Sequence, residues 1–426
     1  MRALGKRGTM TAEERRAARV PVPREIRVLV GAAFIIALGF GLIAPILPQY
    51  ARSFDVSVLA ASFVVSSFSI MRLCFAPASG RLVDRFGHRR TYLTGLSIVA
   101  ASTLLVAVAQ DYWQLLVFRA LGGVGSTMFT VSAMALIVRI SPPSIRGRCS
   151  SLYGGAFLVG NVVGPAVGAA MASWGMRVPF VIYGVALFLA TAVVAVMLNP
   201  GALRQKVPRS TQPMMTLREA WSDSAYRSAL CSGFANGWSN FGVRVAIVPL
   251  FAAATFSRGA EVAGLALTFF ALGNVCALTF SGALSDTYGR KPLILAGLAV
   301  NGTFTGIFGL MHGNVSLILA CVAAGAGAGL LNPSQQAVLA DVVGPDRQGG
   351  RVLSHYQMAQ DLGSISGPLL VGALVDAAGF TAGFLACGLI TGLALVAWLF
   401  GRETNPMLVT GERAAESDDH PVGRAT

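Results

Sequence analysis

Four ionisable side chains lie inside long apolar segments of this sequence: Arg72, Arg119, Arg244 and Asp361. Burying an ionisable group in hydrocarbon is costly, so its presence there favours a functional role over simple packing. At 1.5 Å per helical residue, Asp361 lies about 14 Å and Arg72 about 12 Å from the ends of their segments. We assign proton coupling to these four residues, with Asp361 as the candidate proton carrier.

The chemistry expected of Asp361 follows from its surroundings. The proton affinity of a buried carboxylate rises when the group is desolvated and falls when an arginine approaches. A partner that is lost and regained during a conformational cycle would therefore make Asp361 bind and release a proton. The alternative is a static ion pair that only holds the protein together.

The segments that carry these residues are predicted to be transmembrane helices. The chain of 426 residues is 54% hydrophobic and only 12% charged, whereas soluble proteins carry about 25% charged residues. Apolar stretches of about 20 residues recur throughout, each long enough to cross a bilayer, and they lack the alternation of barrel strands. We therefore predict an all-α integral membrane protein with twelve transmembrane helices. The expected helices are Ile26–Gln49, Val58–Ser79, Thr91–Ala109, Trp113–Val138, Cys149–Ala172, Val178–Leu198, Ser228–Ala252, Val262–Ala283, Pro292–Leu310, Val315–Ala340, Val352–Val375 and Thr381–Phe400.

Charge placement predicts the orientation. With the N-terminus inside and Arg27 counted with the N-terminal tail, 27 of the 33 Lys and Arg residues fall in cytoplasmic segments. Only Arg52, Arg177 and Arg258 fall in outer loops. This bias predicts that both termini lie in the cytoplasm. The membrane is expected to be a bacterial inner membrane. The net charge of +14 is spread over short loops, which argues against nucleic-acid binding. The expected parts are an N-terminal tail (1–25), a six-helix bundle (26–198), a central cytoplasmic loop (199–227), a second bundle (228–400) and a C-terminal tail (401–426).

The two halves of the chain are repeats. Residues 80–87 and 282–289 share Gly, Leu, Asp and Gly at one offset, and 160–165 resembles 363–368. Two parallel repeats predict two pseudo-symmetric six-helix bundles with a substrate site between them, reached alternately from each side.

At these motifs the sequence resembles the major facilitator superfamily, and within it the twelve-helix drug:proton antiporters. The segment 80–90 is similar to the loop signature of the superfamily, with His88 where arginine is usual. Arg119 and the glycines after it resemble a second family motif. The helix at 149–172 resembles the antiporter motif, with Ala169 in place of its last glycine, and Leu38-Gly39 with Pro45–Pro48 resembles the first-helix motif of these antiporters.

The resemblance implies roles for three sets of residues. The cytoplasmic gating motif comprises Gly80, Asp84, Arg85, Gly87, Arg89, Arg90, Gly282, Asp286, Gly289 and Arg290. Asp84 lies at a helix C-terminus, where the dipole disfavours a negative charge, so it needs a partner from elsewhere or is a simple loop cap. The helix-interface motif comprises Gly160, Gly164, Pro165 and Gly168, which would let this helix slide closely against the other half or would serve ordinary helix packing. In the proton-coupling set, Asp361 is expected to pair with Arg72 across the halves, Arg119 to relay protons, and Arg244 to bind substrate or an unidentified partner.

The substrate cavity is expected to be aromatic, with a few amides, which suits varied apolar molecules. Each of its residues could instead pack in a core or face lipid. The candidates are Phe40, Tyr153, Phe157, Asn236, Trp238, Asn240, Phe269, Asn274, Gln357 and Met358.

These features predict a secondary active transporter that exports small amphipathic compounds in exchange for protons by alternating access. Its expected partners are a small-molecule substrate, protons and the lipid bilayer, with no nucleic acid, and it is expected to act as a monomer. We expect no cofactor, no metal and no enzymatic activity, because the sequence offers no nucleophile–base set or metal spacing. The alternatives are a dedicated exporter of one metabolite such as a sugar, and a non-transporting membrane receptor.

Overall fold

The chain is a bundle of long helices in a computed structural model, which describes residues 21–142, 145–198, 213–344, 347 and 349–405. The helices of the first half are α2 (Arg24–Ile43), α3 (Leu47–Arg52), α4 (Val58–Phe86), α5 (His88–Val108), α6 (Tyr112–Ile140), α7 (Arg146–Ala170) and α8 (Val178–Met197). Those of the second half are α9 (Leu217–Ser222), α10 (Ser224–Asn236), α11 (Arg244–Thr255), α12 (Gly259–Tyr288), α13 (Arg290–Gly306), α14 (Asn314–Val343) and α15 (Gly350–Leu399).

The predicted twelve spans are confirmed. Within the described residues, eleven helical stretches are long and apolar enough to cross a membrane, and α15 is one of them, with 50 residues. At 1.5 Å per residue α15 would be about 75 Å long, more than twice the thickness of the hydrocarbon layer. The chain turns at Gly379, where φ is 83°, a value that glycine adopts without strain. α15 therefore contains two spans, as expected from the sequence.

Two spans depart from regular α-helix. The first was expected to run unbroken from Ile26 to Gln49, but α2 ends at Ile43 and the short α3 follows. Pro45 and Pro48 account for the break, since proline lacks an N–H and clashes with the preceding turn. The seventh span joins α10 to α11 through a π-helical turn, Gly237–Val243. Such turns shift the faces of a helix and often occur at functional sites.

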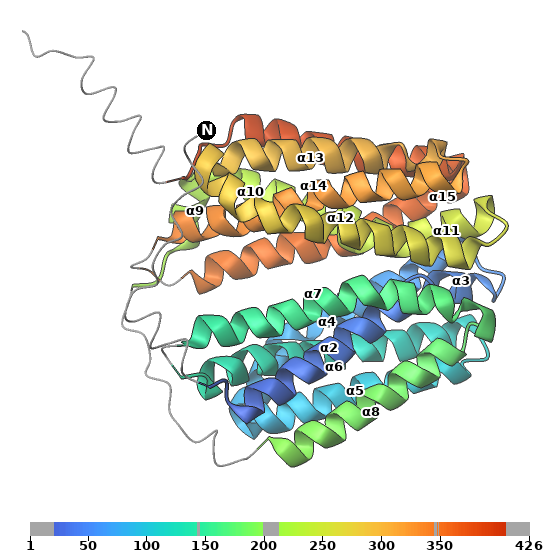
Figure 1. The fold of residues 1–426 in the computed structure, drawn as a ribbon, viewed down its shortest axis with the longest axis horizontal. Coiled ribbons are helices and arrows are strands. Elements are labelled where there is room, and N and C mark those ends of the chain that lie inside the picture. The colour runs from blue at the N-terminus through green and yellow to red at the C-terminus, as the bar shows by residue number, and fades with distance from the viewer. Residues whose placement is uncertain (1–20, 143–144, 199–212, 345–346, 348, 406–426) are drawn as a thin grey trace, which may run out of the picture.

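The two halves form separate layers in Figure 1, the second half above and the first below. We call the end of the bundle with the start of α2 and the turns at Gly87 and Gly289 the near end, and the opposite end the far end. At the far end α3 and α4 pack against α11; along the layers α4 packs against α15, and α7 against α12. These four are the most extensive contacts between the halves within the described residues.

The sequence repeat is reproduced in three dimensions at the near end. Gly87 and Gly289 end α4 and α12 with φ of 80° and 101°, which explains why both positions are glycine. Two residues later, Arg89 donates to the Leu198 carbonyl at the end of α8 at 3.0 Å, and Lys291 donates to the Leu399 carbonyl at the end of α15 at 2.9 Å. In each half a cation thus stabilises the C-terminus of the last helix.

The glycines of α7 do not face the other half, which corrects the expectation that they form the contact between the halves; that this helix slides against the other half stays a prediction. A Cβ added at Gly160 or Gly164 would meet the backbone of α2 at 2.7 or 2.5 Å, and one at Gly168 would meet Leu42 of the same region at 2.4 Å. The glycines therefore allow close packing inside the first half. Pro165 and Ala169, on another face of α7, contact Gly264 of α12 in the second half.

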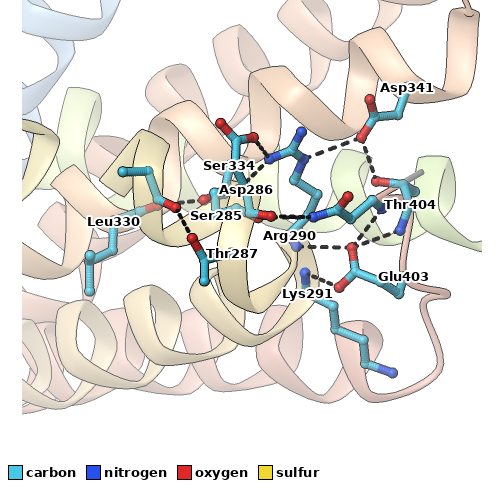
Figure 2. Close-up of polar contacts among 12 residues, drawn as sticks. Ser285, Asp286, Thr287, Arg290, Lys291, Leu330, Ser334, Asp341, Glu403 and Thr404 are labelled. Carbon is cyan, nitrogen blue, oxygen red and sulfur yellow. Dashed lines mark hydrogen bonds and ion pairs between the residues drawn. The ribbon is translucent and has the colours of Figure 1, made fainter. Parts of the chain in front are cut away.

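The segment Arg402–Asn405, at the start of the expected C-terminal tail, is bound to the near end of the second half (Figure 2). The Glu403 carboxylate accepts hydrogen bonds from the backbone N–H groups of Arg290 and Lys291, both at 2.9 Å, and so caps α13. Arg402 pairs with Asp223 just before α10 at 2.5 Å. The end of the last span is therefore fixed to α10 and α13.

Replacing Glu403 with glutamine should lower the free energy of unfolding by about 1 kcal/mol, the usual value of a helix N-cap. Partial burial opposes ionisation of Glu403, but hydrogen bonds from four backbone N–H groups outweigh it and hold the pKa below its ordinary value of 4.5. Its contribution to stability is present above that pH and is lost as the pH falls through the lower folded-state pKa. Thermal unfolding in detergent at neutral pH and at about pH 3 measures the difference.

The matched control is Glu261→Gln, which breaks an exposed ion pair with Arg258 and should change stability little. If the stability difference between the wild type and Glu403→Gln stays constant down to about pH 3, the ionised Glu403 carboxylate is not the source of the stabilisation.

Candidate functional site

A cavity of about 280 Å³ lies between the two halves. The first half contributes residues of α2 and α7, and the second half contributes the π-helical turn, α11, α12 and α14. Its lining is mainly apolar, with one cation and three amides: Phe40, Gly41, Ala44, Leu158, Asn161, Val162, Pro165, Phe241, Arg244, Val245, Leu267, Phe270, Ala271, Asn274 and Asn332. A cavity shared by both halves is where an alternating-access protein would hold its substrate.

Arg244 is the cation in this lining, and its guanidinium is fixed on two sides. Nε and Nη2 donate to the Asn240 carbonyl at 2.9 and 2.7 Å. The π-helical turn makes this possible, because the Arg244 N–H bonds to the Ser239 carbonyl, five residues back, instead of to Asn240. The guanidinium also lies 3.8 Å from the centroid of the Phe270 ring, a cation–π contact. No described acidic residue pairs with Arg244.

A chain of asparagine amides supports this part of the cavity. Asn240 donates to Asn236, and Asn236 donates to Asn332 of α14, both at 2.8 Å. Asn301 of α13 donates to Asn240 at 3.1 Å and to the Ala324 carbonyl at 2.8 Å. Because a buried amide without a partner is costly, this chain fixes three spans of the second half relative to one another.

Arg119 lies behind the aromatic wall of the first half. Its side chain is only 8% exposed, and its guanidinium lies 4.1 Å from the Phe68 ring centroid and 6.0 Å from that of Phe40. Nε has no hydrogen-bond partner among the described residues. Since Phe40 lines the cavity, the second buried cation is one aromatic ring away from it.

Asp361 of α15 and Arg72 of α4 lie close enough for their charges to interact, because α4 packs against α15. They do not form a direct ion pair among the described residues. Asp361 instead accepts a hydrogen bond from Gln357, one helical turn away, at 3.2 Å. A carboxylate with a nearby but unbound cation can change its proton affinity when the two helices move.

The predicted cavity residues divide into three groups. Phe40 and Asn274 line the cavity, whereas Phe270 takes the place expected of its neighbour Phe269. A second group is buried but does not line the cavity, and two of its members, Asn236 and Asn240, belong to the amide chain; the third is Trp238. The π-helical turn explains why the expected face of this span differs from the observed one. The third group is not part of the lining and comprises Tyr153, Phe157, Gln357 and Met358. The ring centroids of Tyr153 and Phe157 lie 5.4 Å apart, and Gln357 donates a hydrogen bond to Asp361.

The gating motif is seen most completely in the second half. Arg290 binds Asp286 and donates to Ser285 at 3.1 Å and to Asp341 of α14 at 3.3 Å. All of these groups belong to the second half, so in this state Asp286 does not bridge the halves. In the first half, the Arg85 guanidinium lies 5.4 Å from the Phe86 ring. The side chain of Asp84 lies outside the described residues, so its expected latch stays a prediction, as do the gating roles of Gly80, Gly282 and Arg90.

Asp376, which no motif in the sequence singles out, joins the halves at the far end. Its carboxylate accepts hydrogen bonds from the backbone N–H groups of Val58 at 2.9 Å and Leu59 at 2.8 Å, the first residues of α4. A carboxylate is favourable at a helix N-terminus because the dipole is positive there. Deeper in the same interface, Ser66 donates to the Ile365 carbonyl at 3.1 Å.

Replacing Asp376 with alanine should weaken the far-end contact by about 1 kcal/mol, which shifts the balance between closed and open far ends about fivefold. Gln110 and His312 are exposed loop residues of the two halves at the far end. Spin labels at these two positions should lie farther apart in the variant than in the wild type, as measured by electron paramagnetic resonance. The labelled protein should lack the six native cysteines, so that the label attaches only to cysteines introduced at the two chosen positions.

Ser57→Ala is the control for Asp376→Ala, because the Ser57 hydroxyl caps the same helix by accepting from the Ala60 N–H at 3.2 Å and makes no hydrogen bond to a described residue of the other half. An equal shift in both variants would contradict a gating role for Asp376, since it would reflect fraying of α4 alone.

Comparisons with known proteins agree with this architecture. The family model described as Major Facilitator Superfamily matches residues 29–237 and 229–422. The chain is 24% identical over 382 residues to multidrug resistance protein 1 of Bacillus subtilis strain 168, covering 88% of this chain and 96% of that protein. It is 28% identical over 377 residues to the class C tetracycline resistance protein of Escherichia coli, covering 86% and 93%. A bacterial homologue of the human lysosomal transporter Spinster, crystallised inward-facing and unoccupied, shares the fold with a TM-score of 0.72 at 14% identity, over 88% of this chain and 95% of that one.

Proposed function

Since the chain belongs to the Major Facilitator Superfamily and is a transporter of that family, we propose that it exports small amphipathic compounds, such as drugs or secondary metabolites, in exchange for protons. The observation that carries the proposal is the mainly apolar cavity lined by both halves. The names of the relatives, a multidrug resistance protein and a tetracycline resistance protein, support the substrate class. The proposal gives the protein no catalytic activity.

The proposed cycle moves the two halves, residues 26–198 and 228–400, against each other. The near end faces the cytoplasm, because Lys and Arg are concentrated in the loops on that side. In the present state the contacts of Asp376 and Gly264 close the outer entrance. Substrate enters the cavity from the cytoplasm, and the halves then separate at the far end to release it.

Proton binding at Asp361 drives this cycle in the proposal. Asp361 belongs to the second half and Arg72 to the first, so separation of α4 and α15 changes the distance between the two charges. Protonation from the outer side and release to the cytoplasm would then couple proton entry to substrate export. The protein acts as a monomer in this scheme, because both halves of the site come from one chain.

Transport by the purified protein in liposomes tests the proposed function. A pH gradient with the membrane potential clamped at zero should drive several amphipathic compounds of a mixed panel uphill, and a protonophore should abolish the effect. Uphill movement of a single compound would favour the dedicated exporter. If no compound responds to the gradient, proton-coupled export is the wrong function.

A further inference from the structure

The guanidinium of Arg244 has one edge without a bonding partner. Of its five N–H donors, one on Nε and one on Nη2 are taken by the Asn240 carbonyl. Nη1 and the second Nη2 hydrogen have no hydrogen bond to any described residue. These donors form the planar edge of the guanidinium that binds a carboxylate through two parallel hydrogen bonds.

This edge belongs to a side chain that lines the cavity between the halves. The rest of the lining is apolar or amide, and no described acidic residue is part of it. Arg119, behind Phe40, adds a second positive charge. The cavity is therefore electrostatically positive and has no carboxylate of its own to receive a cationic ligand.

We propose that the central cavity binds amphipathic organic carboxylates, with the anionic group on the free edge of Arg244 and the apolar body against Phe40 and Phe241. The proposal rests on the proposed export function, whose substrate class it narrows from amphipathic compounds in general to anions.

Charge compensation favours an anionic ligand in this cavity. A cation held in a low-dielectric site with only carbonyl and aromatic partners gains most from a ligand that brings the opposite charge. Two hydrogen bonds hold the guanidinium in one orientation, so little further ordering is needed when a carboxylate arrives. A cationic ligand of the same shape would meet repulsion from both arginines.

Three ligands with one apolar body and different head groups test the proposal on the wild-type protein. Naphthylacetate is an anion at neutral pH, naphthylacetamide is neutral, and naphthylethylamine is a cation. Calorimetry on the detergent-solubilised full chain should give at least about tenfold tighter binding for the carboxylate than for the amide, the effect of a hydrogen bond to a charged group. The amine should bind more weakly than both. Equal affinities, or a preference for the amine, would overturn the proposal.

Arg244→Gln should remove the preference for the carboxylate and leave binding of the amide within about threefold of wild type. A glutamine can still donate to the Asn240 carbonyl. Arg258→Gln, the same substitution at an exposed far-end residue, is the control and should keep the preference. A preference that survives in Arg244→Gln overturns the proposal, because another group would then bind the anion.

Arg244→Lys covers the case in which Arg244→Gln does not fold. It keeps the charge but loses the two-pronged edge, so the preference should fall without vanishing. An unchanged preference would overturn the proposal.

Failure of this inference is distinguishable from failure of the proposed function. If the liposome experiment shows proton-driven export of neutral and cationic compounds but calorimetry shows no anion preference, the function stands and the carboxylate site is wrong. Carboxylate binding that depends on Arg244, without any proton-driven transport, supports the site and overturns the export function.

Discussion

Asp361→Asn is expected to abolish uphill transport while leaving the exchange of substrate across the membrane intact. With one proton exchanged per substrate, a pH difference of one unit supplies about 1.4 kcal/mol and supports about a tenfold substrate gradient in the wild type. The variant should reach no gradient. Asparagine has the shape of aspartate and can still accept the hydrogen bond from Gln357, so the bundle should remain folded.

Two further variants separate proton coupling from a static role of this charge. Asp361→Glu keeps a titratable group and should retain part of the gradient-driven uptake. The double variant Arg72→Asp with Asp361→Arg restores the charge pair with reversed positions, and should fold but fail to couple. Normal coupling in either Asp361→Asn or the reversed pair would show that Asp361 is not the proton carrier.

Gly264→Val is expected to block transport by preventing the far end from closing. A Cβ at Gly264 would lie 2.4 Å from the Cβ of Ala169 and 2.9 Å from the carbonyl oxygen of Pro165, both in the other half. Overpacking of this kind costs about 1–3 kcal/mol, and the upper value corresponds to more than a hundredfold shift in population. The strain is relieved when the halves separate, so the variant should unfold at nearly the wild-type temperature but show a longer distance between labels at Gln110 and His312.

Gly164→Val is the matched control, because its Cβ would lie 2.5 Å from the Leu38 carbonyl oxygen of α2 in the same half. Separation of the halves cannot relieve that clash. This variant should therefore lose about 1–3 kcal/mol of stability without a change in the distance between the labels. An unchanged label distance and normal transport in Gly264→Val would contradict a gating role for the contact between α7 and α12.

The sequence predicted the features that depend on one helix or on the repeat. Twelve spans follow from apolar length, and the paired glycines at 87 and 289 follow from the repeated loop. It could not tell which neighbour the glycines of α7 face. A four-residue spacing shows only that one face is small. In the second half, Gly363 of α15 packs in the same manner against Phe234 of α10, and Gly367 against Trp238 of the π-helical turn.

The site depends on contacts to backbone groups, which the sequence pattern does not predict. Asp376 binds residues 317 and 318 positions away through backbone N–H groups, which carry no side-chain signal. The partner of Arg244 is likewise a backbone carbonyl, left to it by a π-helical turn that apolar periodicity does not indicate. A buried arginine without any acidic residue nearby in the sequence was the available clue, and it pointed to a ligand.

The binding of Arg402–Asn405 to the near end has a consequence for biosynthesis. In the first half, Arg89 binds the Leu198 carbonyl at the end of α8. Both residues have been synthesised once the ribosome reaches position 198. In the second half, the cap of α13 is supplied by Glu403, more than a hundred residues later. The first bundle can thus fold while translation continues, whereas the second lacks this cap until Glu403 has left the ribosome. Fusion partners should accordingly be joined after residue 405.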